Sequence, residues 1–190
     1  MEKKQVGDIS KLYLSNRDIE KGVHKIVNAM YAEQWRPDYI VGITRGGLVP
    51  AVMLSHLTGI RMHTLDVRLR DDDIQQTCTW MADDAYGIFQ QGGEYEAKNI
   101  LILDDINDTG ATFQWIVDDW QKSNGVSVPT IDIPVPNHKI DRWKEVWHKN
   151  VRFASIVNNL SSEFEVDYSD IEVNKAEEDV WIVFPYEEWW

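Results

Sequence analysis

The residues best suited to chemistry follow one apolar run, residues 100–103, which reads Ile-Leu-Ile-Leu. Asp104 and Asp105 come directly after it, and Asp108 leads into a turn that consists of Thr109, Gly110, Ala111 and Thr112. The carboxylate pair can accept hydrogen bonds from vicinal hydroxyls and can hold a hard cation such as Mg²⁺. Amides around Gly110, with the Thr109 and Thr112 hydroxyls, can bind a phosphate at the start of a helix. The segment therefore offers opposite chemistries, one for hydroxyls and cations and one for anions.

The apolar run itself predicts a strand buried on both faces, as in a parallel sheet that helices cover. Open α/β sheets bind their ligands in the crevice at the carboxyl ends of such strands. We therefore expect an α/β fold with the acidic residues at the mouth of a crevice. The alternative interpretation is a strand that ends in a solvated acidic turn, whose Thr and Gly residues only cap the next helix.

A second candidate loop follows another predicted strand, residues 39–43, and reads Thr44-Arg45-Gly46-Gly47. Glycines allow close approach of the backbone to a ligand, and an arginine fork can bind phosphate through two hydrogen bonds. The helix that follows, with Gly59 as its stop, points its amino end at this turn. On its own, such a turn is also typical of a tight connection without a binding role.

Taken together, the two loops resemble the phosphoribosyl pyrophosphate (PRPP) signature and the pyrophosphate loop of the type I phosphoribosyltransferases. The resemblance covers about residues 38–70, 98–124 and 151–188. The motif Arg-Gly-Gly-Leu-Val-Pro is most similar to that of the xanthine-guanine/hypoxanthine (purine) branch. It implies a central, mostly parallel sheet flanked by helices, with a small hood built from terminal segments. It also implies a homo-oligomer, either a dimer or a tetramer.

The resemblance assigns roles to individual residues. Asp104 and Asp105 are expected to bind the ribose hydroxyls and Mg²⁺, Asp108 to lie beside the incoming base as the catalytic residue, and residues 109–112 to hold the 5′-phosphate. Arg45 and Gly46 are expected to contact the pyrophosphate. We also expect a strained peptide between Thr44 and Arg45, with the cis form as one option, that turns an amide toward pyrophosphate.

Three residues near the carboxyl terminus are candidates for binding the base. The ending Trp-Ile-Val-Phe-Pro at 181–185 is similar to that of the purine branch, which implies that Trp181 stacks on the purine and that the backbone at Ile182 reads the ring edge. The alternative is a core strand with a Trp anchor. Counting back from the Phe-x-x-Asp-Tyr pattern at 164–168 places Asn159 where the branch has a lysine that donates to O6. Asn159 can still read an oxo or an amino group, or it can be a surface residue.

Other segments are less informative. The chain is expected to open with a helix from about residue 15, capped by Ser15 or Asn16. Residues 71–97 have little periodicity and are expected to form a lid or to lack structure, and Arg68 and Arg70 beside them could clamp pyrophosphate or be solvated. Residues 126–150 are interpreted as an insertion. We predict one domain over residues 1–190, with a core of about 15–157 and a hood and base-recognition tail of about 158–190.

Composition excludes some classes of function. The 190 residues carry a formal net charge of −13, which argues against broad binding of nucleic acid or anionic membranes. Cys78 is the only cysteine, so no internal disulfide is expected. No apolar run has the length of a membrane span and the start lacks a signal-peptide core, so we expect a cytoplasmic protein.

The predicted activity is transfer of the 5-phosphoribosyl group from PRPP to a purine-like base, which gives a nucleoside 5′-monophosphate and pyrophosphate, as in purine salvage. Mg²⁺ is the expected cofactor, and the expected partners are PRPP and the base, without nucleic acid or membrane. The alternative is a regulator that senses PRPP, binds nucleic acid and has little catalytic activity. The net charge of −13 counts against this alternative, because a protein surface that binds nucleic acid needs a basic patch.

Overall fold

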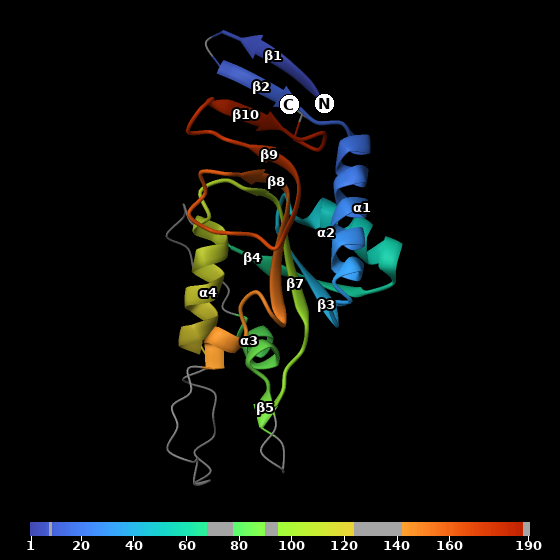
Figure 1. The fold of residues 1–190 in the computed structure, drawn as a ribbon, viewed down its shortest axis with the longest axis vertical. Coiled ribbons are helices and arrows are strands. Elements are labelled where there is room, and N and C mark those ends of the chain that lie inside the picture. Colours follow the sequence, from blue (N-terminus) through green and yellow to red (C-terminus); the bar gives the residue numbers. More distant parts are fainter. Residues whose placement is uncertain (8, 68–77, 90–94, 124–141, 188–190) are drawn as a thin grey trace.

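The computed structural model describes residues 1–7, 9–67, 78–89, 95–123 and 142–187 (Figure 1). In this part of the chain, a five-stranded parallel sheet forms the centre of the fold, in the order β4-β3-β7-β8-β9. These strands are β4 (Arg61–Asp66), β3 (Tyr39–Thr44), β7 (Ile100–Asn107), β8 (Val151–Asn159) and β9 (Tyr168–Val173). The predicted α/β fold is confirmed.

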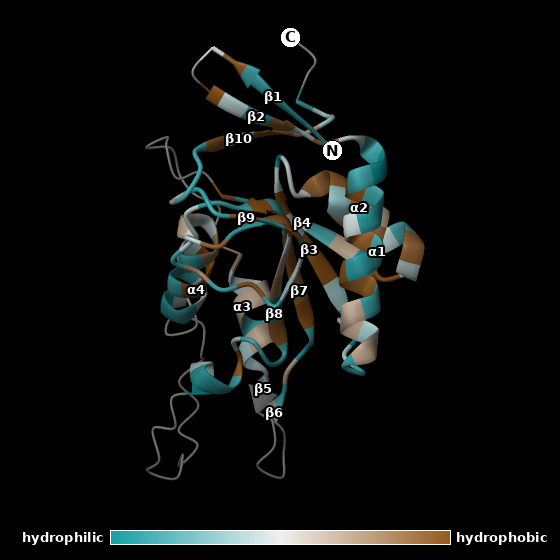
Figure 2. Cartoon of the chain, turned by 45° about the horizontal axis from the view of Figure 1, so that its top comes forward, coloured by the Kyte–Doolittle hydropathy of each residue, from teal (hydrophilic) through white to brown (hydrophobic). Residues whose placement is uncertain are grey.

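Helices cover both faces of this sheet, so its middle strands are buried on both sides. On one face lie α1 (Asn16–Ala32) and α2 (Leu48–Thr58), and on the other lie α3 (Thr79–Tyr86), α4 (Ala111–Ser123) and the 3₁₀ helix η1 (Arg142–Glu145). Leu101 and Leu103 of β7 pack with the first group, and Ile100 and Ile102 pack with the second. All four side chains are fully buried, as the uninterrupted apolar run predicts. Figure 2 shows the same concentration of hydrophobic residues along β3 and β7.

A small second sheet joins the two ends of the chain. It consists of β1 (Glu2–Val6), β2 (Ile9–Tyr13) and β10 (Val180–Val183), with β1 and β2 antiparallel and β2 and β10 parallel. Figure 1 shows this hood beyond the end of the central sheet where β7 leads into α4. The expectation that the chain opens with a helix is wrong, because β1 and β2 precede α1. β1 is exposed throughout, and neither strand has an apolar alternation that would predict it, so the two strands are defined by their pairing with each other and by that of β2 with β10.

Two further expectations need correction. β9 pairs with β8 in the central sheet, although the boundary near residue 158 assigned it to the hood. The unstructured stretch at 71–97 contains α3 and two short strands, β5 (Ile88–Phe89) and β6 (Tyr95–Glu96). With eight residues, α3 is too short to show a clear period, yet it buries Met81, Ala82 and Ala85. Residues 142–150 of the expected insertion are described, and Val146 is buried in the core.

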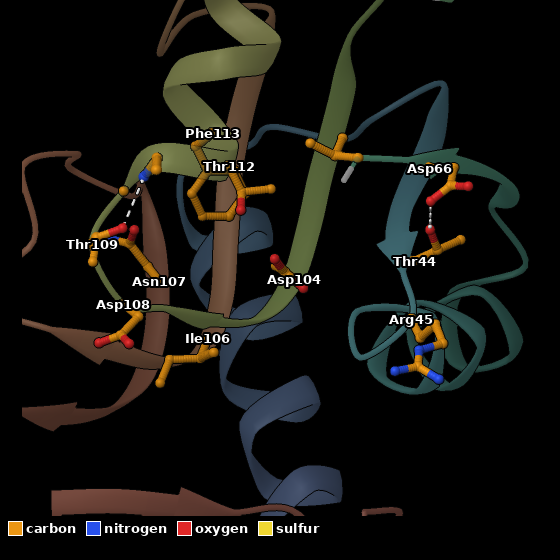
Figure 3. A pocket seen from close by; sticks show the side chains of 13 residues that line it. Thr44, Arg45, Asp66, Asp104, Ile106, Asn107, Asp108, Thr109, Thr112 and Phe113 are labelled. Atoms are coloured by element: carbon orange, nitrogen blue, oxygen red, sulfur yellow. Dashed lines mark hydrogen bonds between the residues drawn. The ribbon is translucent and has the colours of Figure 1, made fainter. Parts of the chain in front are cut away.

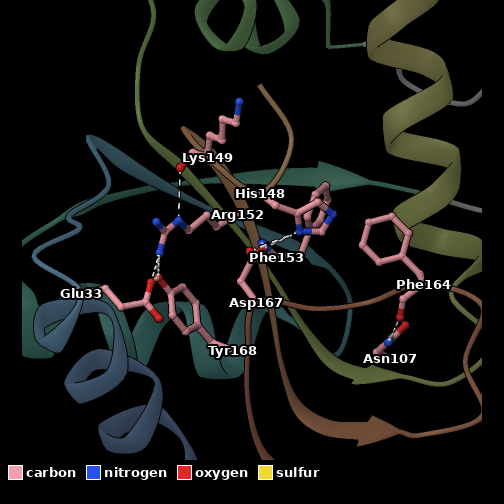
Figure 4. A network of polar contacts seen from close by, with 9 residues as sticks. All are labelled: Glu33, Asn107, His148, Lys149, Arg152, Phe153, Phe164, Asp167 and Tyr168. Atoms are coloured by element: carbon pink, nitrogen blue, oxygen red, sulfur yellow. Dashed lines mark hydrogen bonds and ion pairs between the residues drawn. The ribbon is translucent and has the colours of Figure 1, made fainter. Parts of the chain in front are cut away.

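Polar contacts tie α1 to the far edge of the sheet. Arg152 on β8 pairs with Glu33, the residue that caps the carboxyl end of α1, and donates to the Tyr168 hydroxyl on β9 (Figure 4). Asp167 accepts from the Phe153 amide at 2.7 Å and lies 3.2 Å from Nδ1 of His148. These contacts hold β8 and β9 in register below the candidate site. In the described residues, no helix is long and apolar enough to cross a membrane.

The start of α1 gives a prediction about stability. Ser15 and Asp18 form a capping box, and hydrogen bonds from the Ser15 side chain and backbone hold the pKa of Asp18 below its usual value. Because the folded pKa is lowered, the ionised carboxylate contributes stability above about pH 4, and this contribution is lost as the pH falls toward the folded pKa. Asp18→Asn should lower the free energy of unfolding by about 1 kcal/mol at pH 7.

Urea unfolding at pH 7 and at pH 3 measures this effect. The difference between the native protein and Asp18→Asn should be smaller at pH 3 than at pH 7. Glu20→Gln on the exposed side of the same helix is the control and should change stability by less than about 0.5 kcal/mol. An unchanged difference at the two pH values would contradict the capping role of the charge.

Candidate functional site

A cavity of about 850 Å³ opens at the carboxyl ends of β4, β3 and β7. This volume is in the range of small-molecule sites. The predicted residues Arg45, Asp104 and Asp108 contribute to its wall, and Figure 3 shows Asp104 between the other two, which lie on opposite sides. The full lining consists of Thr44, Arg45, Asp66, Val67, Asp104, Ile106, Asn107, Asp108, Thr109, Gly110, Ala111, Thr112 and Phe113. Two loops that are far apart in sequence therefore meet in one cavity.

The loop after β3 packs against the end of β7 without room for side chains. A Cβ atom added to Gly46 would lie 1.8 Å from Oδ2 of Asp105, and one added to Gly47 would lie 2.5 Å from the Leu103 carbonyl oxygen. Real Cβ atoms do not approach other atoms so closely, so both positions require glycine. The peptide bond between Thr44 and Arg45 is cis, the unusual form expected here. The Thr44 hydroxyl donates to Asp66 at 2.7 Å, which ties the loop to β4.

The carboxylate pair is divided between the cavity and the loop. Asp104 lines the cavity, and its Oδ1 accepts from the Asp105 amide at 2.9 Å. Asp105 is buried, and its carboxylate lies against Gly46 and accepts from the Tyr186 hydroxyl at 3.3 Å. Burial raises the pKa of Asp105 to about 6, and burial together with the Asp105 charge raises the pKa of Asp104 well above its usual range. Two adjacent buried carboxylates are therefore electrostatically unfavourable unless a cation or a set of donors compensates them.

Tyr186 connects the carboxyl-terminal tail to this pair. Its ring stacks on Phe184, with the ring centroids 5.4 Å apart, and Phe184 is itself buried in the core. Burial and the neighbouring carboxylate of Asp105 raise the pKa of Tyr186, so that its hydroxyl remains a donor at neutral pH. The tail after β10 is thereby held over the end of β7.

On the opposite side of the cavity, the 108–112 loop is shaped by Gly110. This residue has a φ of +87°, and an added Cβ atom would lie 2.5 Å from Cβ of Phe164. Asn107 is also buried here, and its Nδ2 donates to the Phe164 carbonyl at 2.7 Å (Figure 4). The same Nδ2 donates to Oδ1 of Asn158 at 2.8 Å. The segment after β8 therefore supports the loop from behind, and Thr109 and Thr112 remain on its cavity side.

Asn159 is the last residue of β8, and Asp108 directly follows β7, the neighbouring parallel strand, so the two residues lie next to each other. Its side chain is only 6% exposed, so it is not a surface residue. Nδ2 donates to the Asp108 carbonyl at 2.8 Å, and Oδ1 accepts from the Ser161 amide and hydroxyl and from the Lys175 amide. Rotation of this amide to read a base would break these bonds. Contact between Asn159 and a base stays a prediction, and the geometry favours a role in positioning its neighbours.

The other two candidates for base binding lie in the hood. Ile182 is buried in the core, whereas the side chain of Trp181 is 62% exposed. The alternation along β10 places these neighbours on opposite faces of the small sheet. Neither is among the residues that line the cavity. An exposed indole is available for stacking, but its contact with a base also stays a prediction.

The comparisons with known proteins identify the class. Residues 10–188 match the phosphoribosyl transferase domain, so the chain belongs to that family. The family that the two loops resemble is therefore confirmed.

Solved structures share the fold at low sequence identity. The purine phosphoribosyltransferase of Pyrococcus horikoshii is 22% identical, with a TM-score of 0.60 and coverage of 94% of this chain and 95% of that chain. The xanthine-guanine-hypoxanthine phosphoribosyltransferase of Helicobacter pylori is 16% identical, with a TM-score of 0.57 and coverage of 93% and 91%. A hypothetical protein from Neisseria gonorrhoeae with bound ppGpp is 15% identical, with a TM-score of 0.61 and coverage of 94% and 90%. These likenesses show the type I phosphoribosyltransferase fold.

Several site residues were not predicted from the sequence. Asp66 and Asn107 line the cavity, and Lys175 forms an ion pair with Asp108. Asp66 and Asn107 are the last residues of β4 and β7, and a polar residue at the carboxyl end of a strand is the signal that could have found them. Lys175 follows β9, which was not predicted as part of the central sheet. The predicted clamp residues Arg68 and Arg70 lie outside the described residues, as do residues 126–141.

The close packing of Gly46 predicts a selective loss of anion binding. Gly46→Ala would push its Cβ into the Asp105 carboxylate, so the loop must move away from the end of β7. We expect the affinity for pyrophosphate, with Mg²⁺ present, to fall at least about tenfold, which corresponds to about 1.4 kcal/mol. Isothermal titration calorimetry measures this affinity.

Gly59→Ala is the matched control. Gly59 caps α2 with a φ of +71° and has no atom within 4 Å of an added Cβ, so the substitution strains the fold without touching the cavity. This variant should lose about 1 kcal/mol of stability and keep its affinity for pyrophosphate. Equal affinities for Gly46→Ala and the native protein would show that the loop is not the anion site.

Proposed function

We propose that the protein transfers the 5-phosphoribosyl group from PRPP to a ring nitrogen of a purine-like base and releases pyrophosphate. The observation that carries this proposal is the meeting of the Arg45-Gly46-Gly47 loop and the 108–112 loop in one cavity, with Asp104 between them. PRPP carries a phosphate at each end of a ribose with vicinal hydroxyls. An anion loop on each side of a carboxylate matches this order of groups.

In this proposal the two loops bind the two phosphate ends. The amides and hydroxyls of residues 109–112 hold the 5′-phosphate at the start of α4, where the helix dipole favours an anion. Arg45 and the glycine amides hold the pyrophosphate. Glycosyl transfer develops positive charge at C1 and negative charge on the leaving group, so donors already oriented toward pyrophosphate stabilise the transition state more than the substrate.

The carboxylate pair fits the ribose hydroxyls and Mg²⁺. Among the described residues, no group of three or more His, Cys, Asp or Glu could hold a metal ion by itself. Mg²⁺ commonly binds through one or two carboxylates together with substrate phosphates, so Asp104 and Asp105 are a suitable protein contribution. The raised pKa values of these two groups are further support, because a cation relieves the repulsion between them. When bound, Mg²⁺ would supply positive charge beside the leaving pyrophosphate.

Asp108 is the proposed catalytic residue on the base side. Its side chain is 46% exposed and lines the cavity beyond the phosphate loop, where an incoming base can reach it. A carboxylate there can accept a proton from a ring N–H and thereby make another ring nitrogen a better nucleophile. Trp181 would stack on the base and the backbone at Ile182 would read its edge, as the resemblance implies.

The assay that tests the proposal combines the protein, Mg²⁺ and PRPP with a panel of purine and pyrimidine bases. Release of pyrophosphate and formation of the nucleoside 5′-monophosphate are both measured, and turnover is expected with at least one purine. Tight binding of PRPP without turnover of any base would overturn the proposal and favour the PRPP-sensing regulator. Mobility shifts of RNA and DNA, with and without PRPP, would then test that regulator directly.

The role of Asp108 gives a second prediction. Asp108→Asn should lower kcat by about 10²-fold or more and leave the affinity for PRPP nearly unchanged, because the ribose and phosphate contacts remain. Steady-state kinetics and PRPP titration separate the two effects. Asp118→Asn is the control and should change neither quantity, because Asp118 is an exposed residue of α4 whose Oδ1 accepts a hydrogen bond from Gln114. A parallel loss of PRPP affinity in Asp108→Asn would instead place Asp108 in the ribose site.

A further inference from the structure

Asn107 is a buried polar residue of the cavity wall to which the resemblance assigns no role. It is the last residue of β7, and its side chain is only 1% exposed. Its Nδ2 donates to the Phe164 carbonyl at 2.7 Å and to Oδ1 of Asn158 at 2.8 Å, and its Oδ1 accepts from the Ser162 hydroxyl at 3.0 Å. Both ends of this side-chain amide are therefore bonded within the protein, which is the condition for burying it without a large penalty.

These bonds fix the segment that starts at the end of β8, residues 159–164, which we call the support segment. Within it, the Ser162 amide donates to the Asn159 carbonyl at 2.9 Å, and the Phe164 amide donates to the Ser162 hydroxyl at 3.2 Å. Figure 4 shows Phe164 next to Asn107, which lies on the neighbouring strand. The support segment is therefore a turn that closes on itself and is joined to β7 through the Asn107 side chain.

The support segment in turn holds two carbonyl groups of the 108–112 loop. Nδ2 of Asn159 donates to the Asp108 carbonyl at 2.8 Å. The Glu163 amide donates to the Thr109 carbonyl at 3.2 Å. Two consecutive carbonyls at the start of the loop are thus directed at the same neighbour.

Gly110 brings the next part of the loop into direct contact with the support segment. The three atoms nearest to a Cβ added at this position lie between 2.5 and 2.9 Å from it, and all three belong to Phe164 and Ser162. These are the two residues of the support segment that bond to Asn107. A shift of either one would therefore be felt at Gly110.

The direction of the two carbonyls sets the direction of the loop amides. In a trans peptide the C=O and the following N–H point in opposite directions, and both peptides here are trans. Because the carbonyls of Asp108 and Thr109 point to the support segment, the amides of Thr109 and Gly110 point away from it. In the part of the chain that the structure describes, the cavity wall includes residues 106–113 and none of residues 159–164. The two amides therefore face the cavity, beside the start of α4.

We propose that Asn107 is a positioning residue for phosphate binding: it fixes the support segment, which turns the amides of the 108–112 loop toward the 5′-phosphate. This inference rests on the proposed function and adds a residue that acts through Ser162 and Phe164. An apolar side chain of similar size would fill the same space, but it would leave the Phe164 carbonyl and the Ser162 hydroxyl without their partner. The support segment would then move to satisfy these groups, and the loop amides would lose their common direction.

The effect is expected to be confined to one end of the cavity, because the Thr44–Gly47 loop is held by other contacts. Gly46 packs against the Asp105 carboxylate, and the Thr44 hydroxyl donates to Asp66 on β4. None of these contacts involves the support segment. Asn107 should therefore govern the affinity for a phosphomonoester and not the affinity for pyrophosphate.

Asn107→Leu tests the inference, because it keeps the approximate size of the side chain and removes its donors and its acceptor. Isothermal titration calorimetry is carried out with ribose 5-phosphate and, separately, with pyrophosphate and Mg²⁺. We expect the affinity for ribose 5-phosphate to fall at least about tenfold, as for the loss of one hydrogen bond to a charged group. The affinity for pyrophosphate should stay within about twofold, so the ratio of the two affinities changes.

Ser162→Ala is the second variant, and it decides the matter if Asn107→Leu does not fold. It removes the hydroxyl that donates to Asn107 and accepts from the Phe164 amide, and it leaves the bond between Asn107 and the Phe164 carbonyl in place. The affinity for ribose 5-phosphate should fall about threefold to tenfold, in the same direction as in Asn107→Leu. The affinity for pyrophosphate should again stay within about twofold.

Asn150→Leu is the matched control. Nδ2 of Asn150 also donates to two carbonyls, those of Ala85 and Lys98, each at 2.9 Å. Asn150 directly precedes β8, so it lies at the end of the central sheet opposite to the cavity. This variant should lower the midpoint of urea unfolding, as the loss of two internal hydrogen bonds requires, and leave the ratio of the two affinities unchanged.

The outcomes separate the inference from the proposed function. If Asn107→Leu binds ribose 5-phosphate as the native protein does, or loses both affinities equally, the inference is overturned and the proposed function stands. A selective loss in Asn150→Leu would also overturn it, because instability alone would then explain the effect. If the native protein binds ribose 5-phosphate but turns over no base, the proposed function fails and the affinity ratio still decides the inference. If the native protein binds no ribose 5-phosphate, both are overturned.

Discussion

The contact between the Gly46-Gly47 backbone and the end of β7 is the constraint on which the rest of the site depends. At these two positions any side chain would overlap Asp105, Leu103 or Asp104. The absence of side chains lets one loop sit directly on the neighbouring strand. The parallel pairing of β3 with β7 brings the carboxyl ends of both strands to the same level, so the loops that follow them share one cavity.

A cost accompanies this close packing. Asp105 is buried beside the loop and the adjacent Asp104 is partly buried, and burial disfavours the charged forms of both carboxylates. The fold compensates only in part, through the Tyr186 hydroxyl and the Asp105 amide. A site that stays electrostatically incomplete is suited to a cation or to hydroxyl donors, since these supply what the protein leaves out. In the proposed function, the loops at the two ends of the cavity bind anions, and the carboxylates between them bind a cation or hydroxyl groups.

The base side is organised differently, by strand ends that converge from three segments. Asp108 directly follows β7, Asn159 is the last residue of β8, and Lys175 lies in the turn after β9. The positions of these side chains follow from the order of the strands in the sheet. The buried side-chain amide of Asn159 forms hydrogen bonds with the backbones of both other residues. Asn159 stands where the resembled branch has a lysine, and in this chain it positions its neighbours.

The sequence by itself determined the central strands, both loops and the candidate PRPP residues, because local patterns encode them. Four consecutive apolar residues are enough to predict a strand buried on both faces, and two consecutive glycines after a strand are enough to predict that the backbone of the loop approaches a neighbour closely. Only the tertiary structure decided which carboxylate lines the cavity, where β9 pairs, and which lysine meets Asp108. The first and the last of these features depend on contacts between residues 59 or more positions apart, Gly46 with Asp105 and Lys175 with Asp108, and no local pattern carries them.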